Sequence, residues 1–367
     1  MLLGHDPIFD RFRRTLRAGR LASTFLFVGP PGIGKRSFAI QLAQGLLCDR
    51  RPEEALDPCG QCPACAQVLA GTHPDVVVVA KPADKNYIPL ELLIGDKDHR
   101  MREGLCHDIS LKPFSGRRKV AVIDDADFLN QEGANALLKT LEEPPPRSLL
   151  ILIGTSEQRQ LPTIRSRCQV VRFSPLAEAD VADLLLSTGS CSDEPLARRA
   201  AALSGGSLAK AIQWCDEDFL AFRATLYEQF SQRDYDLPPL AKTVTSFVEA
   251  AGKDAAQKRA RMREVLTMGL DFYQHLIATL SGSAPPVGRG SPDPAHPVGR
   301  GSPDPALQAA VATTTRWWPG DAESAAACVE TCLDALSHVD ANANLTTLAE
   351  WWLDELSQSA RTGLAAR

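Results

Sequence analysis

The sequence predicts an α/β domain with a parallel five-stranded sheet, followed by a small helical domain and a larger all-α domain. Five short apolar runs occur in the first half of the chain, at residues 25–28, 76–79, 120–123, 149–153 and 170–173. Each run is nearly continuous, which is typical of strands that are buried on both faces of a parallel sheet. After Pro175 these runs cease, and Ala- and Leu-rich segments with helical spacing follow.

Helical segments separate the predicted strands. The clearest two cover residues 35–47 and 132–143. Three consecutive prolines, Pro144, Pro145 and Pro146, end the second one, because proline cannot continue a helix. This alternation of strands and helices is that of an α/β domain.

We expect domain boundaries after residues 175 and 217, so that the three domains cover 1–175, 176–217 and 218–367. The stretch PVGRGSPDPA at 286–295 recurs unchanged at 297–306. Such Pro/Gly/Ser-rich text cannot bury a core, which predicts a disordered insertion at about 283–306. Near the end, residues 341–356 carry apolar side chains at three- and four-residue steps, which predicts a packed helix with its tryptophans in the core or at a subunit contact.

Composition limits the classes of function. The 367 residues carry a net charge of -5, with 24 Lys and Arg against 20 Asp and Glu up to Pro175 and 16 against 25 after it. A mildly basic first half suits phosphate binding but lacks the basic stripe of a dedicated DNA reader. No apolar run approaches the roughly 20 residues that span a bilayer, and residues 1–19 do not resemble a signal peptide, so we expect a cytoplasmic protein.

A phosphate-binding loop is predicted where GPPGIGK follows the first strand and opens a helix. Its glycines let backbone N–H groups wrap a phosphate, and the lysine supplies a point charge. An ordinary Gly/Pro turn is the alternative, which this context disfavours. The candidate nucleotide-binding residues in this segment are Gly29, Pro30, Pro31, Gly32, Ile33, Gly34, Lys35, Arg36 and Ser37.

The metal-binding part of this predicted site is damaged. An arginine, Arg36, stands where a hydroxyl that holds Mg²⁺ is expected, and Ser37 comes one residue late, about 100° further round the helix. The strand at 120–123 ends in Asp124 and Asp125, where a magnesium ligand and a water-polarising carboxylate are expected. Asp125 is one methylene shorter than the usual glutamate, and errors of about an ångström can cost roughly 100-fold in rate. A solvated strand end is the alternative interpretation of these carboxylates.

A four-cysteine group follows the loop helix. Cys48, Cys59, Cys62 and Cys65 form two overlapping C-x-x-C turns plus one thiol at the end of the preceding helix. Four thiolates in a tetrahedron are typical of structural Zn²⁺. An iron–sulfur cluster also suits such turns, but no further cysteine follows at ferredoxin spacing, so zinc is favoured.

The motifs together resemble the subunits of the bacterial DNA polymerase III clamp loader. They are GPPGIGK, the four-cysteine group, GTHPDV at 71–76, ANALLKTLEEPP at 134–145 and TIRSRC at 163–168. The delta-prime subunits are the most similar branch, and the gamma/tau subunits are next. The resemblance implies an AAA+ domain, a helical lid and a helical collar in a hetero-pentameric ring with gamma/tau and delta subunits. That ring acts on a sliding clamp and primed DNA within the DNA polymerase III holoenzyme.

The resemblance also implies roles for single residues. In Ser166-Arg167-Cys168 the arginine, Arg167, would act in trans on ATP bound to a neighbouring subunit, and Thr155 matches a residue that senses the γ-phosphate. Active members carry Thr or Ser at position 36, Glu at position 125 and an arginine at the position of Ala209. These departures suit a stator that donates an arginine finger without hydrolysing ATP. A gamma/tau-like ATPase is the alternative, and a zinc-dependent DNA-binding module is a third, weaker one.

Overall fold

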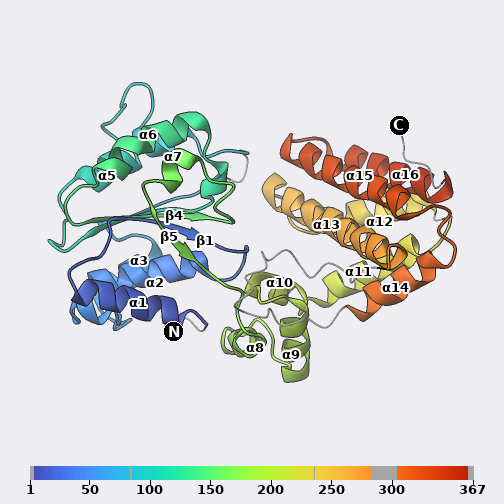
Figure 1. Cartoon of the computed structure of the whole chain (residues 1–367), viewed down its shortest axis with the longest axis horizontal. Coiled ribbons are helices and arrows are strands. Elements are labelled where there is room, and N and C mark those ends of the chain that lie inside the picture. Colours follow the sequence, from blue (N-terminus) through green and yellow to red (C-terminus); the bar gives the residue numbers. More distant parts are fainter. Residues whose placement is uncertain (1–3, 83–84, 235, 283–303, 363–367) are drawn as a thin grey trace. The chain divides into compact units, whose positions relative to one another are not determined.

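The computed structural model describes residues 4–82, 85–234, 236–282 and 304–362. It divides into two compact units, Met1–Ala211 and Ile212–Arg367 (Figure 1). The domain boundaries expected after residues 175 and 217 stay predictions. Of the insertion predicted at about 283–306, residues 283–303 lie outside the described residues.

The first unit contains the predicted parallel sheet. Its strands follow the order β2-β3-β4-β1-β5. All four neighbouring pairs are parallel, which confirms the α/β fold class. The strands are β1 (Thr24–Val28), β2 (Val76–Val79), β3 (Lys119–Ile123), β4 (Ser148–Gly154) and β5 (Gln169–Arg172).

Helices cover both faces of this sheet, which explains why the strands are apolar throughout (Figure 1). One face packs against α1 (Asp6–Arg17), α2 (Lys35–Leu47) and α3 (Pro63–Ala70), with the short η1 (Glu53–Ala55) beside them. The other face packs against α4 (Leu90–Ile94), α5 (Leu105–Ser110), α6 (Gln131–Glu142) and α7 (Pro162–Arg165), with η2 (Ala126–Phe128) after β3. Three further helices follow the sheet: α8 (Glu178–Ser187), α9 (Glu194–Leu203) and α10 (Leu208–Gln213).

The second unit is all-helical in its described residues, as predicted. It contains α11 (Glu217–Phe230), α12 (Leu237–Glu249), α13 (Ala255–Leu280), α14 (Pro305–Thr315), α15 (Ala322–Asp340) and α16 (Leu345–Thr362). One apolar core joins these helices, and Trp352 of α16 is fully buried in it.

Two predicted ranges in this unit need adjustment. The last helix begins at Leu345 rather than at residue 341, because Asn342 is left-handed (φ 62°) and the Asn344 side chain caps the new helix by accepting from Thr346 N and Thr347 N. The end of the duplicated segment is helical, since α14 begins at Pro305 behind the capping side chain of Asp304.

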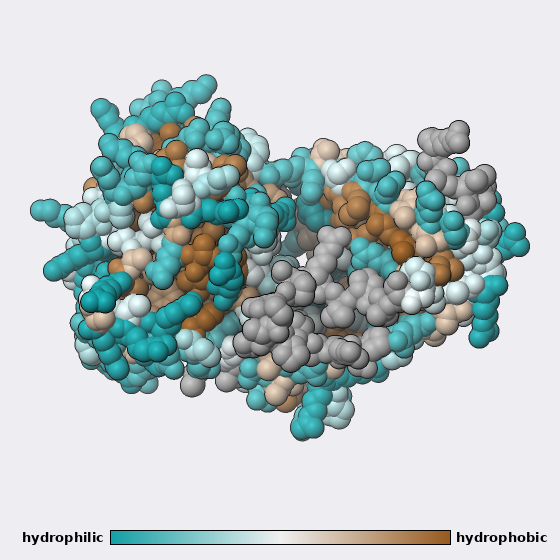
Figure 2. Space-filling model, in the orientation of Figure 1, coloured by the Kyte–Doolittle hydropathy of each residue, from teal (hydrophilic) through white to brown (hydrophobic). Residues whose placement is uncertain are grey.

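The surface is mostly hydrophilic on the face seen in Figure 2, and apolar residues gather in narrower areas of each unit. Among the described residues, no helix combines the length and apolar character needed to cross a membrane.

Candidate functional site

The predicted phosphate loop connects the carboxyl end of β1 to α2. Gly29, Gly32 and Gly34 have φ values of 154°, 76° and 92°, which glycine adopts without strain. A Cβ on Gly29 would lie 2.4 Å from the Phe173 carbonyl oxygen, so the loop turns tightly against the chain that follows β5. The sequence therefore places a glycine at each point where the backbone requires it.

Lys35 is turned into its own loop. Its Nζ donates to the carbonyl oxygens of Gly29 and Pro30, each at 2.6 Å, and the residue is 7% exposed. Burial lowers the pKa of Lys35, although the carboxylates of Asp127, Asp124 and Asp125 act in the opposite direction. The ammonium group thus satisfies backbone carbonyls at the position where it would contact a phosphate.

Residues before and within α10 cover the same loop. Ser207 Oγ donates to the Pro31 carbonyl at 3.1 Å, and the Ala209 N–H donates to the Gly32 carbonyl at 3.4 Å. A Cβ at Gly32 would lie 2.3 Å from Ser207 Oγ and 2.7 Å from the Ala209 Cβ. These contacts tie the start of α10 to the phosphate loop, which the sequence did not reveal.

Arg36 pairs with the first carboxylate at the end of β3. Its Nε lies 3.6 Å from Asp124 Oδ2, and the two side chains are 61% and 19% exposed. Ser37, the next residue of α2, is exposed. The chain's own guanidinium thus stands beside the carboxylate that would hold a magnesium ion.

Asp127 organises the end of β4 and was not among the predicted site residues. Its Oδ2 accepts from Thr155 N at 2.9 Å and from Thr155 Oγ1 at 2.5 Å, and Gln160 Nε2 donates to Oδ1. Asp125 has a left-handed backbone (φ 57°), which turns the chain between the strand and η2. The Thr155 hydroxyl is thereby engaged inside the chain.

Arg167 lies near the amino-terminal ends of the strands, whereas the phosphate loop lies at their carboxyl ends. Its carbonyl accepts from Thr24 Oγ1 at 2.7 Å, and Thr24 is the first residue of β1, whereas the loop follows the last. Four residue steps along a strand cover about 13 Å, which is longer than an arginine side chain. Ser166 is exposed beside it, and burial raises the pKa of Cys168 to about 12. Arg167 therefore cannot reach the phosphate loop of its own chain.

The four cysteines converge. Their sulfur atoms all lie within 4.8 Å of one another, with Cys48, Cys62 and Cys65 buried and Cys59 half-buried. Backbone N–H groups point at two of the sulfurs: Cys62 N lies 3.3 Å from Cys59 Sγ, and Cys65 N lies 3.4 Å from Cys62 Sγ. The Gln61 N–H, first among several donors, lowers the pKa of Cys59 to about 6. Burial raises the pKa of Cys65 to about 12, so the thiolate is favoured at Cys59 and not at every cysteine. The convergence of the four sulfurs is the reason that the group could hold a metal ion.

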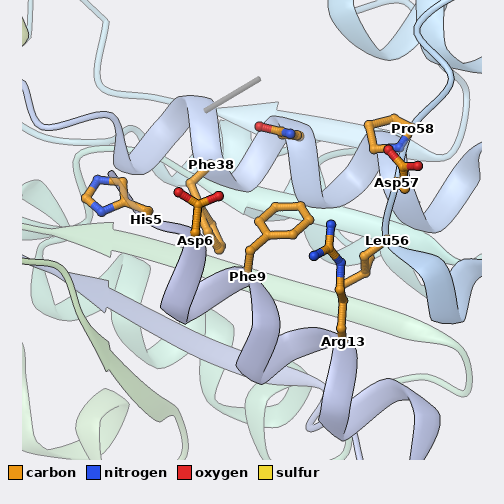
Figure 3. Close-up of a pocket in the computed structure, with 9 residues that line it drawn as sticks. His5, Asp6, Phe9, Arg13, Phe38, Leu56, Asp57 and Pro58 are labelled. Atoms are coloured by element: carbon orange, nitrogen blue, oxygen red, sulfur yellow. The ribbon is translucent and has the colours of Figure 1, made fainter. Parts of the chain in front are cut away.

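A separate cavity of about 110 Å³ lies between α1, α2 and residues 56–58 (Figure 3). His5, Phe9, Arg13 and Phe38 are among its lining residues. His5 Nε2 is 2.7 Å from the Ile33 carbonyl, so one wall of this cavity is tied to the phosphate loop. None of the lining residues belongs to the predicted site.

Bacterial DNA polymerase III subunits are similar to this chain. The family described as "DNA polymerase III, delta subunit" matches residues 4–177. A DNA polymerase III subunit delta' of Pseudomonas aeruginosa is 38% identical over 188 residues, which are 51% of this chain and 53% of that protein. The delta' subunit of Escherichia coli is 31% identical over 232 residues, 63% of this chain and 65% of that protein.

A DNA polymerase III subunit tau/gamma of Haemophilus influenzae is 30% identical over 220 residues, 59% of this chain and 30% of that protein. The chain thus spans about half to two thirds of the length of the delta' subunits that it matches. Among solved structures, a gamma subunit-related protein from Thermotoga maritima aligns with 95% of this chain and 98% of its own, with a TM-score of 0.41 and 16% identity.

Proposed function

We propose that this chain is a delta-prime-like subunit of a clamp loader, because residues 4–177 match the family described as "DNA polymerase III, delta subunit". In this role it hydrolyses little or no ATP itself. It acts as a stator that supplies Arg167 to ATP on a neighbouring motor subunit while a sliding clamp is loaded onto primed DNA.

The contact between Arg36 and Asp124 is the main support for the proposal that this chain hydrolyses little or no ATP. Phosphoryl transfer in P-loop enzymes needs a cation between the phosphates, the loop hydroxyl and the carboxylate at the strand end. Here a guanidinium lies 3.6 Å from that carboxylate, and no hydroxyl stands at position 36. The Thr155 hydroxyl supports the same conclusion, because it donates to Asp127 and would have to leave that carboxylate to contact a γ-phosphate.

The position of Arg167 supports the proposal that this arginine acts on ATP bound to a neighbouring subunit. It lies near the amino-terminal ends of the strands, away from the phosphate loop of its own chain. A nucleotide that Arg167 contacts must therefore be bound to another chain. A guanidinium delivered in trans stabilises the charge on the transferring phosphoryl group and can be worth about 10³- to 10⁵-fold in rate. The partners would be gamma/tau and delta subunits in a hetero-pentameric ring, joined through the helical second unit.

We propose further that the four-cysteine group binds one structural Zn²⁺. Four thiols satisfy its preference for tetrahedral sulfur ligands and leave no open position for a substrate. The ion would tie the end of α2 to the start of α3, since Cys48 follows one helix and Cys62 caps the other. An iron–sulfur cluster would instead colour the purified protein and appear as iron in elemental analysis.

A reconstituted ring tests the arginine finger. We expect Arg167→Ala to slow single-turnover hydrolysis at the adjacent motor site by about 10³-fold or more, as the loss of a finger does. Arg165→Ala is the matched control, because Arg165 is exposed two residues away and should leave the rate unchanged. Equal rates for wild type and Arg167→Ala would refute the assignment. A gamma/tau-like ATPase would instead turn over ATP as an isolated chain.

A further inference from the structure

Two sequence motifs that are far apart in the chain meet in one ion pair. Glu142 ends α6 in the LEEPP segment, and Arg167 lies in TIRSRC, 25 residues later. Arg167 Nε donates to Glu142 Oε1 at 2.7 Å, and its Nη2 donates to the same oxygen. The side edge of the guanidinium therefore contacts a carboxylate of its own chain.

The position of Glu142 is unfavourable for the helix alone. The carboxyl end of a helix carries a partial negative charge, so a glutamate there is repelled and a cation is preferred. Glu142 is the last residue of α6, and Glu143 follows it as the C-cap. The Arg167 guanidinium compensates for this repulsion at Glu142, which indicates that the carboxylate serves the arginine rather than the helix.

The remaining nitrogen of Arg167 is also engaged. Nη1 donates to the Thr163 carbonyl at 2.9 Å and to Ser166 Oγ at 3.1 Å. All three nitrogens thus have acceptors within the chain, and the side chain is 31% exposed. A phosphate binds arginine through two parallel N–H groups, and Glu142 occupies one such pair, so phosphate and carboxylate compete for it.

We propose that Glu142 is a positioning residue that holds Arg167 in a resting conformation until a neighbour's phosphate replaces the carboxylate. This inference rests on the proposed function, since it assumes that Arg167 acts in trans. When no correctly placed nucleotide is present, Glu142 keeps the Arg167 side chain ordered and leaves fewer Arg167 side chains free to bind a neighbour's phosphate. Its removal releases the finger.

The isolated chain gives the first readout, which does not depend on any partner. In protein labelled with ¹⁵N-arginine, the Nε–H signal of Arg167 is assigned by its loss in Arg167→Lys. We expect the Nε proton to exchange with water about two- to fivefold faster in Glu142→Gln, the range that the loss of a part-exposed ion pair allows. Glu143→Gln is the control, since Glu143 is the exposed neighbour with the same charge. An unchanged signal in Glu142→Gln would overturn the proposal.

The reconstituted ring gives the second readout. Without clamp and DNA, we expect Glu142→Gln to raise the hydrolysis rate by about two- to fivefold and Glu143→Gln to leave it unchanged. A fall or no change with Glu142→Gln, or an equal rise with Glu143→Gln, would overturn the proposal. The double variant Glu142→Gln/Arg167→Ala should lose the rise. If Arg167→Ala alone has no effect, the finger itself is wrong, whereas the exchange result in the isolated chain still stands.

Discussion

Replacing Arg36 by threonine should restore a magnesium-dependent nucleotide site. The substitution removes the guanidinium that lies 3.6 Å from Asp124 and supplies the missing hydroxyl at the position after Lys35. Asp124 would hold a Mg²⁺ ion beside this guanidinium, and a separation of about 4 Å is taken for an order-of-magnitude estimate of their repulsion. The repulsion between charges of one and two at this distance is about 2 kcal/mol in water and about 8 kcal/mol at an effective dielectric constant of 20.

The lower figure applies because the Arg36 side chain is 61% exposed and can swing away from the ion. A gain of about 2 kcal/mol corresponds to roughly 30-fold in affinity. We therefore expect Arg36→Thr to bind Mg²⁺–ATP about 30-fold more tightly than the wild type does. Loss of the surface pair should cost at most about 1 kcal/mol of folding stability.

The assay is a titration with a fluorescent ATP analogue, with Mg²⁺ and separately with EDTA. The ratio of the two affinities isolates the contribution of magnesium, since interactions of the nucleotide that do not involve the metal cancel in it. Arg36→Lys is the control, because it keeps the positive charge and should behave like the wild type. The reasoning is refuted if Arg36→Thr and wild type show the same dependence on magnesium.

Three further predictions concern stability. Removal of the proposed Zn²⁺ with a chelator should lower the melting temperature and make four more thiols reactive in a thiol titration. Asp75 is fully buried, accepts from Phe114 N and Ser115 N, and has a lowered pKa because these donors and the Ser115 hydroxyl outweigh its burial. The stability that the ionised Asp75 contributes is fully present above the ordinary aspartate pKa, and it is lost as the pH falls through the lowered pKa. The wild type should therefore lose more stability in acid than Asp75→Asn does. Urea denaturation at two pH values would measure this difference. Gly269→Ala should cost about 1–3 kcal/mol in the same assay, because its Cβ would lie 2.6 Å from Trp352.

The sequence predicted the elements of the first unit closely where the signal is local. The strands agree with the apolar runs to within about one residue at each end, and α2 has the predicted bounds, because continuous burial and a glycine-rich start are both visible in short windows. The last helix was overextended by four residues at its start, since the capping role of Asn344 was not recognised.

The contacts that decide function were harder to predict. The sequence identified Arg36 as a residue that disturbs the magnesium site, but it did not identify Asp124 as the partner of Arg36. Because β1 and β3 are parallel, their carboxyl ends lie on the same side of the sheet, and this could have suggested Asp124. The hydrogen bonds between Asp127 and Thr155 join residues 28 apart, and Ser207 reaches Pro31 across 176. Periodicity carries no information about such pairs, because it reports which face of an element is buried and not what lies against it.

The most direct test of the account is steady-state ATP hydrolysis by the purified chain alone with excess Mg²⁺. Because Arg36 lies beside Asp124 and the proposed role of Arg167 is on another chain, the wild type should hydrolyse ATP no faster than Lys35→Ala does. Sustained, magnesium-dependent hydrolysis by the wild type that Lys35→Ala removes would contradict it.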